Sequence, residues 1–288
     1  MTCCPKSIIA DILKAREDKG GIVNVYYVAC GGSYAGLHPG KYFLQSEAKK
    51  VTVDHYTANE FCHATPKALG PNSIVITQSH SGTTPETVKA AEIAQKAGAA
   101  SVVITFDDQS PLAKNGDYVL KYEAKATTDM TGMAFGLKLA VEILNQIEGY
   151  ENYDEMMNGF DRIDGIVKHA KEFLTPRAKV FAEEYKDEKL IYMMGSGANY
   201  NVAYSFAICL LMEMQWVNSS AIHSGEYFHG PFEITDRETP FIILMSEGRT
   251  RPLDQRALDF LNRFAEKVII LDAKELGLET IDDKVSEF

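Results

Sequence analysis

The feature that most constrains the fold is an order of short apolar runs that occurs twice along the 288-residue chain. In each copy an apolar run enters a glycine turn, a second run ends in serine about fifty residues later, and a third follows about twenty residues beyond it. The runs cover residues 23–33, 73–79 and 100–105 in the first copy and 189–197, 240–246 and 266–272 in the second. Strands that are apolar throughout and alternate with helices are typical of parallel sheets covered on both faces. The sequence therefore predicts two tandem, doubly wound α/β lobes, each a three-layer αβα arrangement.

A helical connection joins the two predicted lobes. Residues 128–146 place apolar side chains at helical spacing, and residues 153–182 are predicted to be helical with a break near Pro176. We therefore expect a first domain over residues 1–150, which includes an N-terminal helix, and a second domain over residues 151–288.

The composition narrows the classes of partner. A net charge of −11 argues against binding to nucleic acid or to acidic membrane surfaces, so local dipoles and N–H groups must hold any phosphate ligand. The five cysteines follow neither zinc-binding nor disulfide spacing, and no metal-ligand cluster stands out. We find neither a signal-peptide pattern nor a membrane-length apolar run, and we expect a cytoplasmic protein that uses no metal and no cofactor.

The second apolar run of the first copy leads into a loop crowded with hydroxyl groups. Five of the nine residues from 79 to 87 carry a hydroxyl, and Pro85 with Glu86 marks the start of a helix. Free N–H groups and the positive end of the helix dipole make such a helix start a site for phosphate. The alternative is a plain N-capped loop, but a cap needs only one hydroxyl. We therefore favour anion binding, with Ser79, Ser81 and Thr84 as the hydroxyl donors.

A glycine turn follows the first strand of each copy. The turn over Gly31–Ser33 lacks the third glycine of a dinucleotide fingerprint, and no Walker lysine follows it. It suits either a tight strand-to-helix turn or close approach of a ligand, and its place beside the hydroxyl loop favours ligand contact. The matching Gly195–Gly197 turn leaves both interpretations open. Because the segment after Ser246 lacks the hydroxyl density of the first copy, the second lobe is predicted to keep the fold without the phosphate site.

Glu213 is the strongest candidate for a catalytic acid or base. It lies in an apolar run, where a buried carboxylate is costly unless it is paired or functional, although a solvent-facing helix position explains it equally well. His229 precedes a Gly-Pro pair and is expected in a turn, where a histidine is most often a plain surface residue. Together, a glutamate and a histidine can supply the base and the acid for proton transfer beside a carbonyl. His223 and Glu226 are the nearby alternatives.

Three segments resemble the sugar isomerase (SIS) domain family, and the match covers nearly the whole chain as two tandem domains. They are Cys30-Gly-Gly-Ser33, Ser79-His-Ser-Gly-Thr-Thr84 and Ser224-Gly-Glu-Tyr-Phe-His-Gly-Pro231. Within the family, residues 211–216 and 225–234 are most similar to the fructosamine 6-phosphate deglycases, and Asn59-Glu-Phe-Cys62 supports that branch.

The resemblance implies roles for individual residues. Glu213 falls on the proton-shuttling glutamate of the family, and His229 falls on its ring-opening histidine. In relatives this histidine reaches the site from a neighbouring subunit, so we expect a homodimer or higher homo-oligomer with a shared active site. The residues that the resemblance implies hold the sugar phosphate are Ser33, Ser79, Ser81 and Thr84. Gly31, Gly32 and His80 are further expected substrate contacts, and His80 and the segment 122–131 are expected to line the sugar pocket.

The implied activity is hydrolysis of a 6-phosphofructosyl amine or amino acid to a hexose 6-phosphate and the free amine, through enaminol proton transfer. The related glucosamine-6-phosphate synthase carries a glutaminase domain ahead of its isomerase domain. This chain starts almost directly at the sugar domain, which favours release of an amine over amination.

Other readings of the resemblance stay open. Relatives continue beyond the region where this chain stops at Phe288, so the second domain is expected to lack its C-terminal end, and a lysine that the synthase carries there has no assigned counterpart. A ketose–aldose phosphate isomerase or an aminating relative is one alternative function, and a non-catalytic sugar-phosphate sensor is another. Neither the amine nor the form of the adduct, ketoamine or 2-amino aldose, follows from the sequence.

Overall fold

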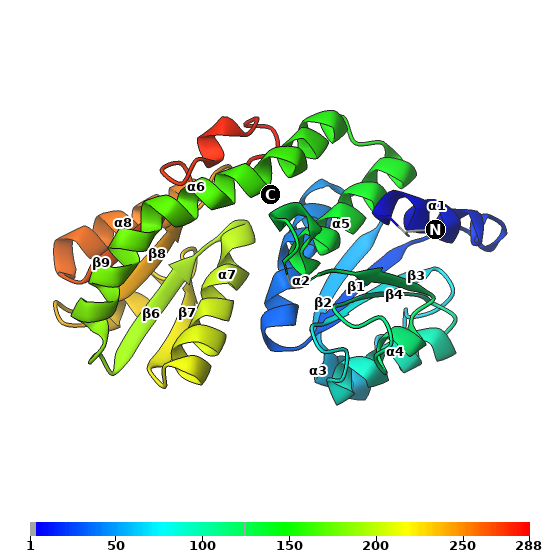
Figure 1. Cartoon of the computed structure of the whole chain (residues 1–288), viewed down its shortest axis with the longest axis horizontal. Coiled ribbons are helices and arrows are strands. Elements are labelled where there is room, and N and C mark those ends of the chain that lie inside the picture. The colour runs from blue at the N-terminus through cyan, green and yellow to red at the C-terminus, as the bar shows by residue number, and fades with distance from the viewer. Residues whose placement is uncertain (1–3, 124) are drawn as a thin grey trace. The chain divides into compact units, whose positions relative to one another are not determined.

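The computed structural model describes residues 4–123 and 125–288, and the chain divides into two compact units, Met1–Tyr153 and Asp154–Phe288. Each unit is built on a parallel sheet with helices around it (Figure 1), which confirms the predicted fold class. The sheet of unit 1 has five strands in the order β2-β1-β3-β4-β5. The sheet of unit 2 has four strands in the order β7-β6-β8-β9.

Unit 1 alternates strands and helices along the chain. Its strands are β1 (Asn24–Ala29), β2 (Thr52–Thr57), β3 (Ser73–Ser79), β4 (Ala100–Thr105) and β5 (Tyr118–Lys121). Its helices are α1 (Pro5–Lys14), α2 (Gly31–Glu47), α3 (Ala58–His63), α4 (Pro85–Lys96) and α5 (Gly132–Glu148). All residues of β3 and β4 are buried, as expected for central strands between two helical layers.

The helices of unit 1 cover both faces of its sheet. Phe61 of α3 and Ala90 of α4 are fully buried against β1 and β3 on one face. On the other face, the hydroxyl of Tyr27 in β1 donates to the carbonyl of Gly136 in α5 at 3.4 Å. Here α2 and α5 approach closely, because a Cβ atom added to Gly40 of α2 would lie 2.4 Å from the Gly136 carbonyl oxygen.

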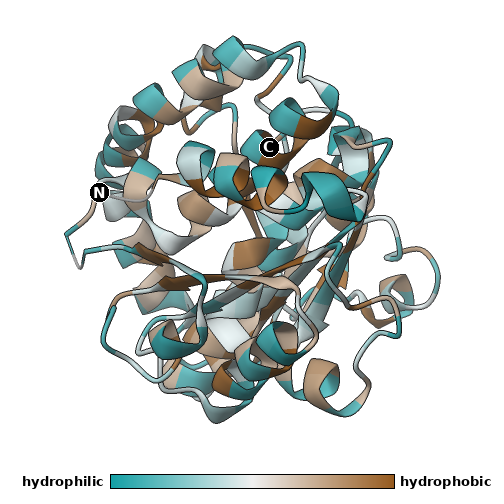
Figure 2. Cartoon of the chain, turned by 90° about the vertical axis from the view of Figure 1, so that its right-hand side faces the viewer, coloured by the Kyte–Doolittle hydropathy of each residue, from teal (hydrophilic) through white to brown (hydrophobic). Residues whose placement is uncertain are grey.

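Unit 2 repeats the pattern with one strand fewer. Its strands are β6 (Leu190–Gly195), β7 (Asn218–His223), β8 (Phe241–Met245) and β9 (Val268–Asp272). Its helices are α6 (Tyr153–Tyr185), α7 (Tyr200–Ser205), a π-helix over Phe206–Met214 and α8 (Arg251–Phe264). Hydrophobic residues dominate the strands and alternate with hydrophilic ones around the helices (Figure 2), as expected for sheets buried between amphipathic helices.

Helix α6 runs unbroken through Pro176, so the predicted break at this residue is wrong. A proline inside a helix removes one N–H donor, here the partner of the Glu172 carbonyl four residues earlier. Glu172 and its neighbours are exposed, so water can donate to that carbonyl instead. Although α6 has 33 residues, no helix within residues 4–123 and 125–288 is both long enough and apolar enough to cross a membrane.

Candidate active site

The strand order places the switch point of unit 1 between β1 and β3. In open parallel sheets, ligands bind beyond the carboxyl ends of the strands at this point. The register pairs Ala29 of β1 with Gln78 of β3. The Gly31–Ser33 turn and the hydroxyl loop over Ser79–Thr84 therefore follow neighbouring strand ends, and the structure brings these predicted site residues to one edge of the sheet.

The hydroxyl of Thr84 does not cap helix α4. Thr84 occupies the N-cap position before Pro85, yet its side chain makes no capping hydrogen bond. Its hydroxyl lies 2.9 Å from that of Ser79, which also accepts a hydrogen bond from the Gly82 N–H at 3.2 Å. A plain N-cap therefore does not explain the hydroxyls, and the first turn of α4 keeps its positive end available to an anion.

Gly82 fixes the path of the hydroxyl loop. Its φ of +66° lies in the left-handed region, and a Cβ atom there would lie 2.0 Å from the Ser110 hydroxyl oxygen. The carbonyl of Gly82 also accepts from the Leu112 N–H at 3.0 Å. The loop is thus packed against the segment that follows β4, so its backbone N–H groups are held in place before any ligand binds.

His80 is an exposed residue of the hydroxyl loop, as are Ser81 and Thr83. Its Nδ1 lies 3.0 Å from the hydroxyl of Tyr122, and its ring stacks on Phe106 with centroids 5.2 Å apart. Tyr122 belongs to the segment 122–131 that was expected to line the sugar pocket; residue 124 of that segment lies outside the described residues. Sequence reasoning missed Phe106, which follows β4 with no polar or glycine signal to mark it.

Gly31 and Gln78 are two further residues that shape this edge of the sheet. Gly31 begins α2 with a φ of +56°, which only glycine adopts readily, and the N-cap residue Cys30 makes no side-chain capping bond. Gln78 is 7% exposed, and its Oε1 has no hydrogen-bond partner within the described residues. Its amide would lie 2.8 Å from a Cβ atom on Gly132. The sequence signal for Gln78 was an amide directly before Ser79, at the end of a largely apolar run.

In unit 2 an internal carboxylate takes the place of a bound anion. Oδ2 of Asp254 accepts from the N–H and the hydroxyl of Ser246, at 2.9 and 2.7 Å. Asp254 follows Ser246 by eight residues, as Thr87 follows Ser79 in unit 1, and it is fully buried. Because the donors at the end of β8 already face a carboxylate, a phosphate there would meet like charge.

Both predicted catalytic residues, Glu213 and His229, lie in unit 2. Glu213 is on the π-helix and exposed, so the solvent-facing interpretation holds and burial does not single it out. His229 is exposed in the turn after β7, next to Gly230 with a φ of +136°. Among residues 4–123 and 125–288, neither side chain makes a hydrogen bond or an ion pair. The alternative His223 is engaged, since its Nδ1 accepts from the Gly225 N–H at 3.0 Å.

The π-helix itself is an unusual setting for Glu213. Single π-turns cluster at functional sites in helices, because the extra residue bulges out and re-aims its neighbours. The helix ends at Met214, and two residues later Trp216 has a φ of +58° and is 90% exposed. A bulky residue in the left-handed region is a strained conformation that persists only when the surrounding structure imposes it.

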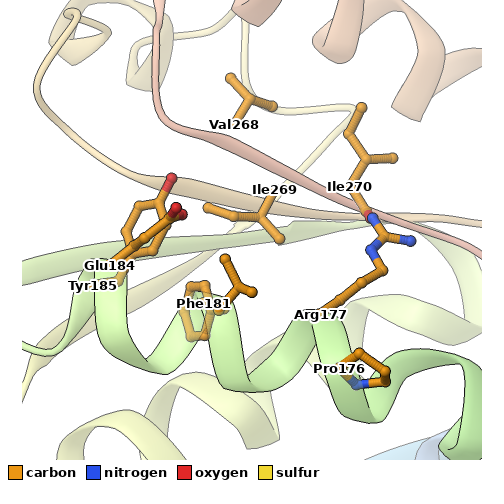
Figure 3. A pocket seen from close by; sticks show the side chains of 9 residues that line it. Pro176, Arg177, Phe181, Glu184, Tyr185, Val268, Ile269 and Ile270 are labelled. Atoms are coloured by element: carbon orange, nitrogen blue, oxygen red, sulfur yellow. The ribbon is translucent and has the colours of Figure 1, made fainter.

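Unit 2 also contains an apolar groove lined by residues of α6 and β9. It has a volume of about 520 Å³ between α6 and the edge strand β9. Figure 3 shows Phe181 and Arg177 of α6 facing Ile269 and Ile270 of β9 across it. None of the predicted site residues lines this groove. The described part of the chain also contains no group of three or more His, Cys, Asp or Glu side chains that could hold a metal ion.

Comparisons with known proteins agree on one family. The SIS domain matches residues 23–146 and 184–277. The chain is 44% identical to fructosamine deglycase FrlB of Bacillus subtilis over 271 residues, which cover 93% of this chain and 82% of the relative. It is 25% identical to fructoselysine 6-phosphate deglycase of Escherichia coli K12, over 94% of this chain and 78% of the relative.

Solved structures agree with the sequence comparisons. A protein from Salmonella typhimurium LT2, proposed to be a phosphosugar isomerase, is 47% identical and superimposes with a TM-score of 0.95. That alignment covers 98% of this chain and 85% of the other. The C-terminal domain of glucosamine-fructose-6-phosphate aminotransferase from Francisella tularensis has the same fold, with 20% identity and a TM-score of 0.81 over 96% of this chain and 83% of the other.

Proposed function

The chain belongs to the SIS domain family, as its motifs indicated, and on this premise we propose that it is a deglycase acting on phosphorylated sugar–amine adducts. The substrate is a 6-phosphofructosyl amine or amino acid, and the products are a hexose 6-phosphate and the free amine. The observation that carries the proposal is the hydroxyl loop at the uncapped start of α4, in a chain 44% identical to a fructosamine deglycase.

The phosphate group of the substrate binds the hydroxyl loop of unit 1. The positive end of α4 and the backbone N–H groups of the loop attract the dianion. The hydroxyls of Ser79, Ser81 and Thr84 can turn from one another to the phosphate oxygens, and Ser33 approaches from the neighbouring strand end. This anchor supplies orientation, so that the sugar carbons are presented to the acid and base in one geometry.

His229 and Glu213 carry out the proton transfers. His229 assists ring opening, which exposes the C2 carbonyl of the ketoamine. Glu213 takes a proton from C1 while the C2 carbonyl oxygen gains one from His229, which gives the enaminol, and Glu213 then returns its proton to C2. The nitrogen of the resulting iminium loses a proton, which restores the acid and leaves a C1 imine. Water adds to C1, the C1–N bond breaks, and the amine leaves with the proton that neutralises it. The exposed positions of both residues fit a site completed by a second copy of the chain, so the active form is a homo-oligomer.

Glu213→Gln tests these roles, because it removes the base and keeps the size and polarity of the side chain. Turnover of 6-phosphofructosyl-lysine, read as glucose 6-phosphate release, should fall at least a hundredfold while the substrate still binds. The matched comparison is Glu226→Gln, which changes another exposed glutamate of unit 2 and should leave turnover within about threefold of wild type. Full activity of Glu213→Gln, or loss of activity in Glu226→Gln alone, would overturn the assignment.

A further inference from the structure

Within the described residues, one ring nitrogen of the hydroxyl loop of unit 1 has no hydrogen-bond partner. Its hydroxyls pair with one another, Ser79 with Thr84 at 2.9 Å and Ser81 with Thr83 at 2.8 Å. The imidazole of His80 uses Nδ1 for its contact with Tyr122. Within the part of the chain that the structure describes, Nε2 of this exposed ring has no hydrogen-bond partner.

Two residues from neighbouring strands hold the His80 ring. Phe106 directly follows β4, and its ring lies nearly parallel to the imidazole, with an angle of 27° between the planes. Its backbone N–H also donates to the His80 carbonyl at 3.2 Å. Tyr122 directly follows β5 and is tied to the sheet by its own N–H, which donates to the Thr105 carbonyl at 3.2 Å. The contacts that orient His80 are therefore anchored on the ends of β4 and β5.

The contact with Tyr122 is compatible with a tautomer of His80 that carries its proton on Nε2. Burial raises the pKa of the Tyr122 hydroxyl, so this group stays protonated at neutral pH and can donate to Nδ1. A neutral imidazole that accepts at Nδ1 carries its proton on Nε2. In that tautomer, Nε2–H is the donor that the ring presents to a ligand.

We propose that Tyr122 and Phe106 are positioning residues that hold His80 so that its Nε2–H donates to the phosphate of the bound sugar phosphate. The inference deepens the proposed function and rests on its assignment of the phosphate to the hydroxyl loop. The chain has a net charge of −11, which repels an anionic ligand. One well-placed local donor therefore contributes appreciably to the binding of the phosphate.

The test is a double-mutant cycle on the binding of glucose 6-phosphate, measured by calorimetry on the full chain. Tyr122→Phe keeps the ring and removes the hydroxyl, and the dissociation constant should rise about fivefold, the equivalent of one ordinary hydrogen bond. In a His80→Gln background the same change should alter the constant less than twofold, because Tyr122 acts through His80. Tyr118→Phe, at the opposite end of β5, is the matched control and should leave binding unchanged.

Two readouts separate positioning from a merely structural role. In Tyr122→Phe, KM for the adduct should rise while kcat stays within about twofold, since the phosphate is remote from the reacting carbons. Nitrogen NMR of the imidazoles should show a neutral His80 with its proton on Nε2 in the wild type and a mixture of tautomers in the variant. An unchanged dissociation constant, or equal effects of Tyr122→Phe with and without His80, overturns the inference.

The same experiments distinguish this inference from the proposed function. Binding of glucose 6-phosphate that depends on Tyr122, in a protein that releases no amine from adducts, upholds the inference and rejects the deglycase. Release of amine with an unchanged KM in Tyr122→Phe upholds the deglycase and rejects the inference.

Discussion

Replacing Gly40 with alanine should destabilise unit 1, because Gly40 lies where α2 and α5 come closest. An added Cβ atom would lie 2.4 Å from the Gly136 carbonyl oxygen and 2.9 Å from the Tyr27 hydroxyl oxygen. Ordinary contacts of this kind begin near 3.4 Å, so α2 and α5 must separate by about 1 Å. That movement also stretches the buried hydrogen bond from Tyr27 to Gly136.

The expected size of the effect follows from three terms. Overpacking in a dense core costs about 1–3 kcal/mol, and weakening a buried hydrogen bond costs about 1 kcal/mol. Alanine offsets part of this, since it favours a helix over glycine by about 1 kcal/mol. The net loss in the free energy of unfolding should be about 2 kcal/mol.

The assay must report on unit 1, because the two units can unfold separately. Hydrogen exchange of the α2 and α5 amides localises the effect, and urea denaturation followed by circular dichroism gives its size. Gly36→Ala, one turn earlier in α2, is the control: its Cβ would meet only the end of the Gln78 side chain at 3.4 Å, so the protein should be as stable as wild type or more stable by up to about 1 kcal/mol. A Gly40→Ala protein as stable as Gly36→Ala would refute this account of the packing.

Two further predictions concern pH and the hydroxyl loop. Burial, with His38 and Lys41 nearby, lowers the pKa of His55 from 6.5 to about 3. Between these two pKa values the unfolded chain binds the proton and the folded chain does not. The free energy of unfolding is therefore highest above pH 6.5 and falls as the pH drops below that value. Urea denaturation should show a loss of at most about 2 kcal/mol in this free energy between pH 7 and pH 5. His55→Gln should remove that slope, and an unchanged slope would contradict a partly buried imidazole that stays neutral in the folded chain. Gly82→Ala forces a Cβ atom to within 2.0 Å of the Ser110 hydroxyl oxygen and should weaken glucose 6-phosphate binding at least about tenfold by calorimetry; wild-type affinity would reject the loop as the anchor.

The central strands could be predicted from the sequence because both of their faces are buried. All residues of Ser73–Ser79 and Ala100–Thr105 are covered, which requires continuous apolar runs. The edge strands Thr52–Thr57 and Asn218–His223 were not predicted, since their many exposed positions carry polar residues that break such a run. The extent of α6 was also misjudged, because the sequence does not show that the carbonyl freed by Pro176 faces solvent.

In the candidate site, too, features that are contiguous in the sequence could be predicted, and contacts between distant residues could not. The hydroxyl loop could be found because strand, loop and helix start are contiguous between residues 73 and 86. The pairing of His80 with Tyr122 joins residues 42 positions apart, and nothing in local spacing reveals it. Likewise, the carboxylate of Asp254 that replaces a ligand at Ser246 becomes visible only when the two units are compared in space.

The measurement that tests the central claim most directly compares 6-phosphofructosyl-lysine with unphosphorylated fructosyl-lysine as substrates of the purified protein. The account predicts stoichiometric release of lysine and glucose 6-phosphate from the first, and a kcat/KM at least about a hundredfold lower for the second, because the phosphate anchors the sugar. Interconversion of fructose 6-phosphate and glucose 6-phosphate without release of any amine would identify an isomerase instead. Tight binding of sugar phosphates with no turnover of either adduct would contradict an enzyme of this class and indicate a sensor.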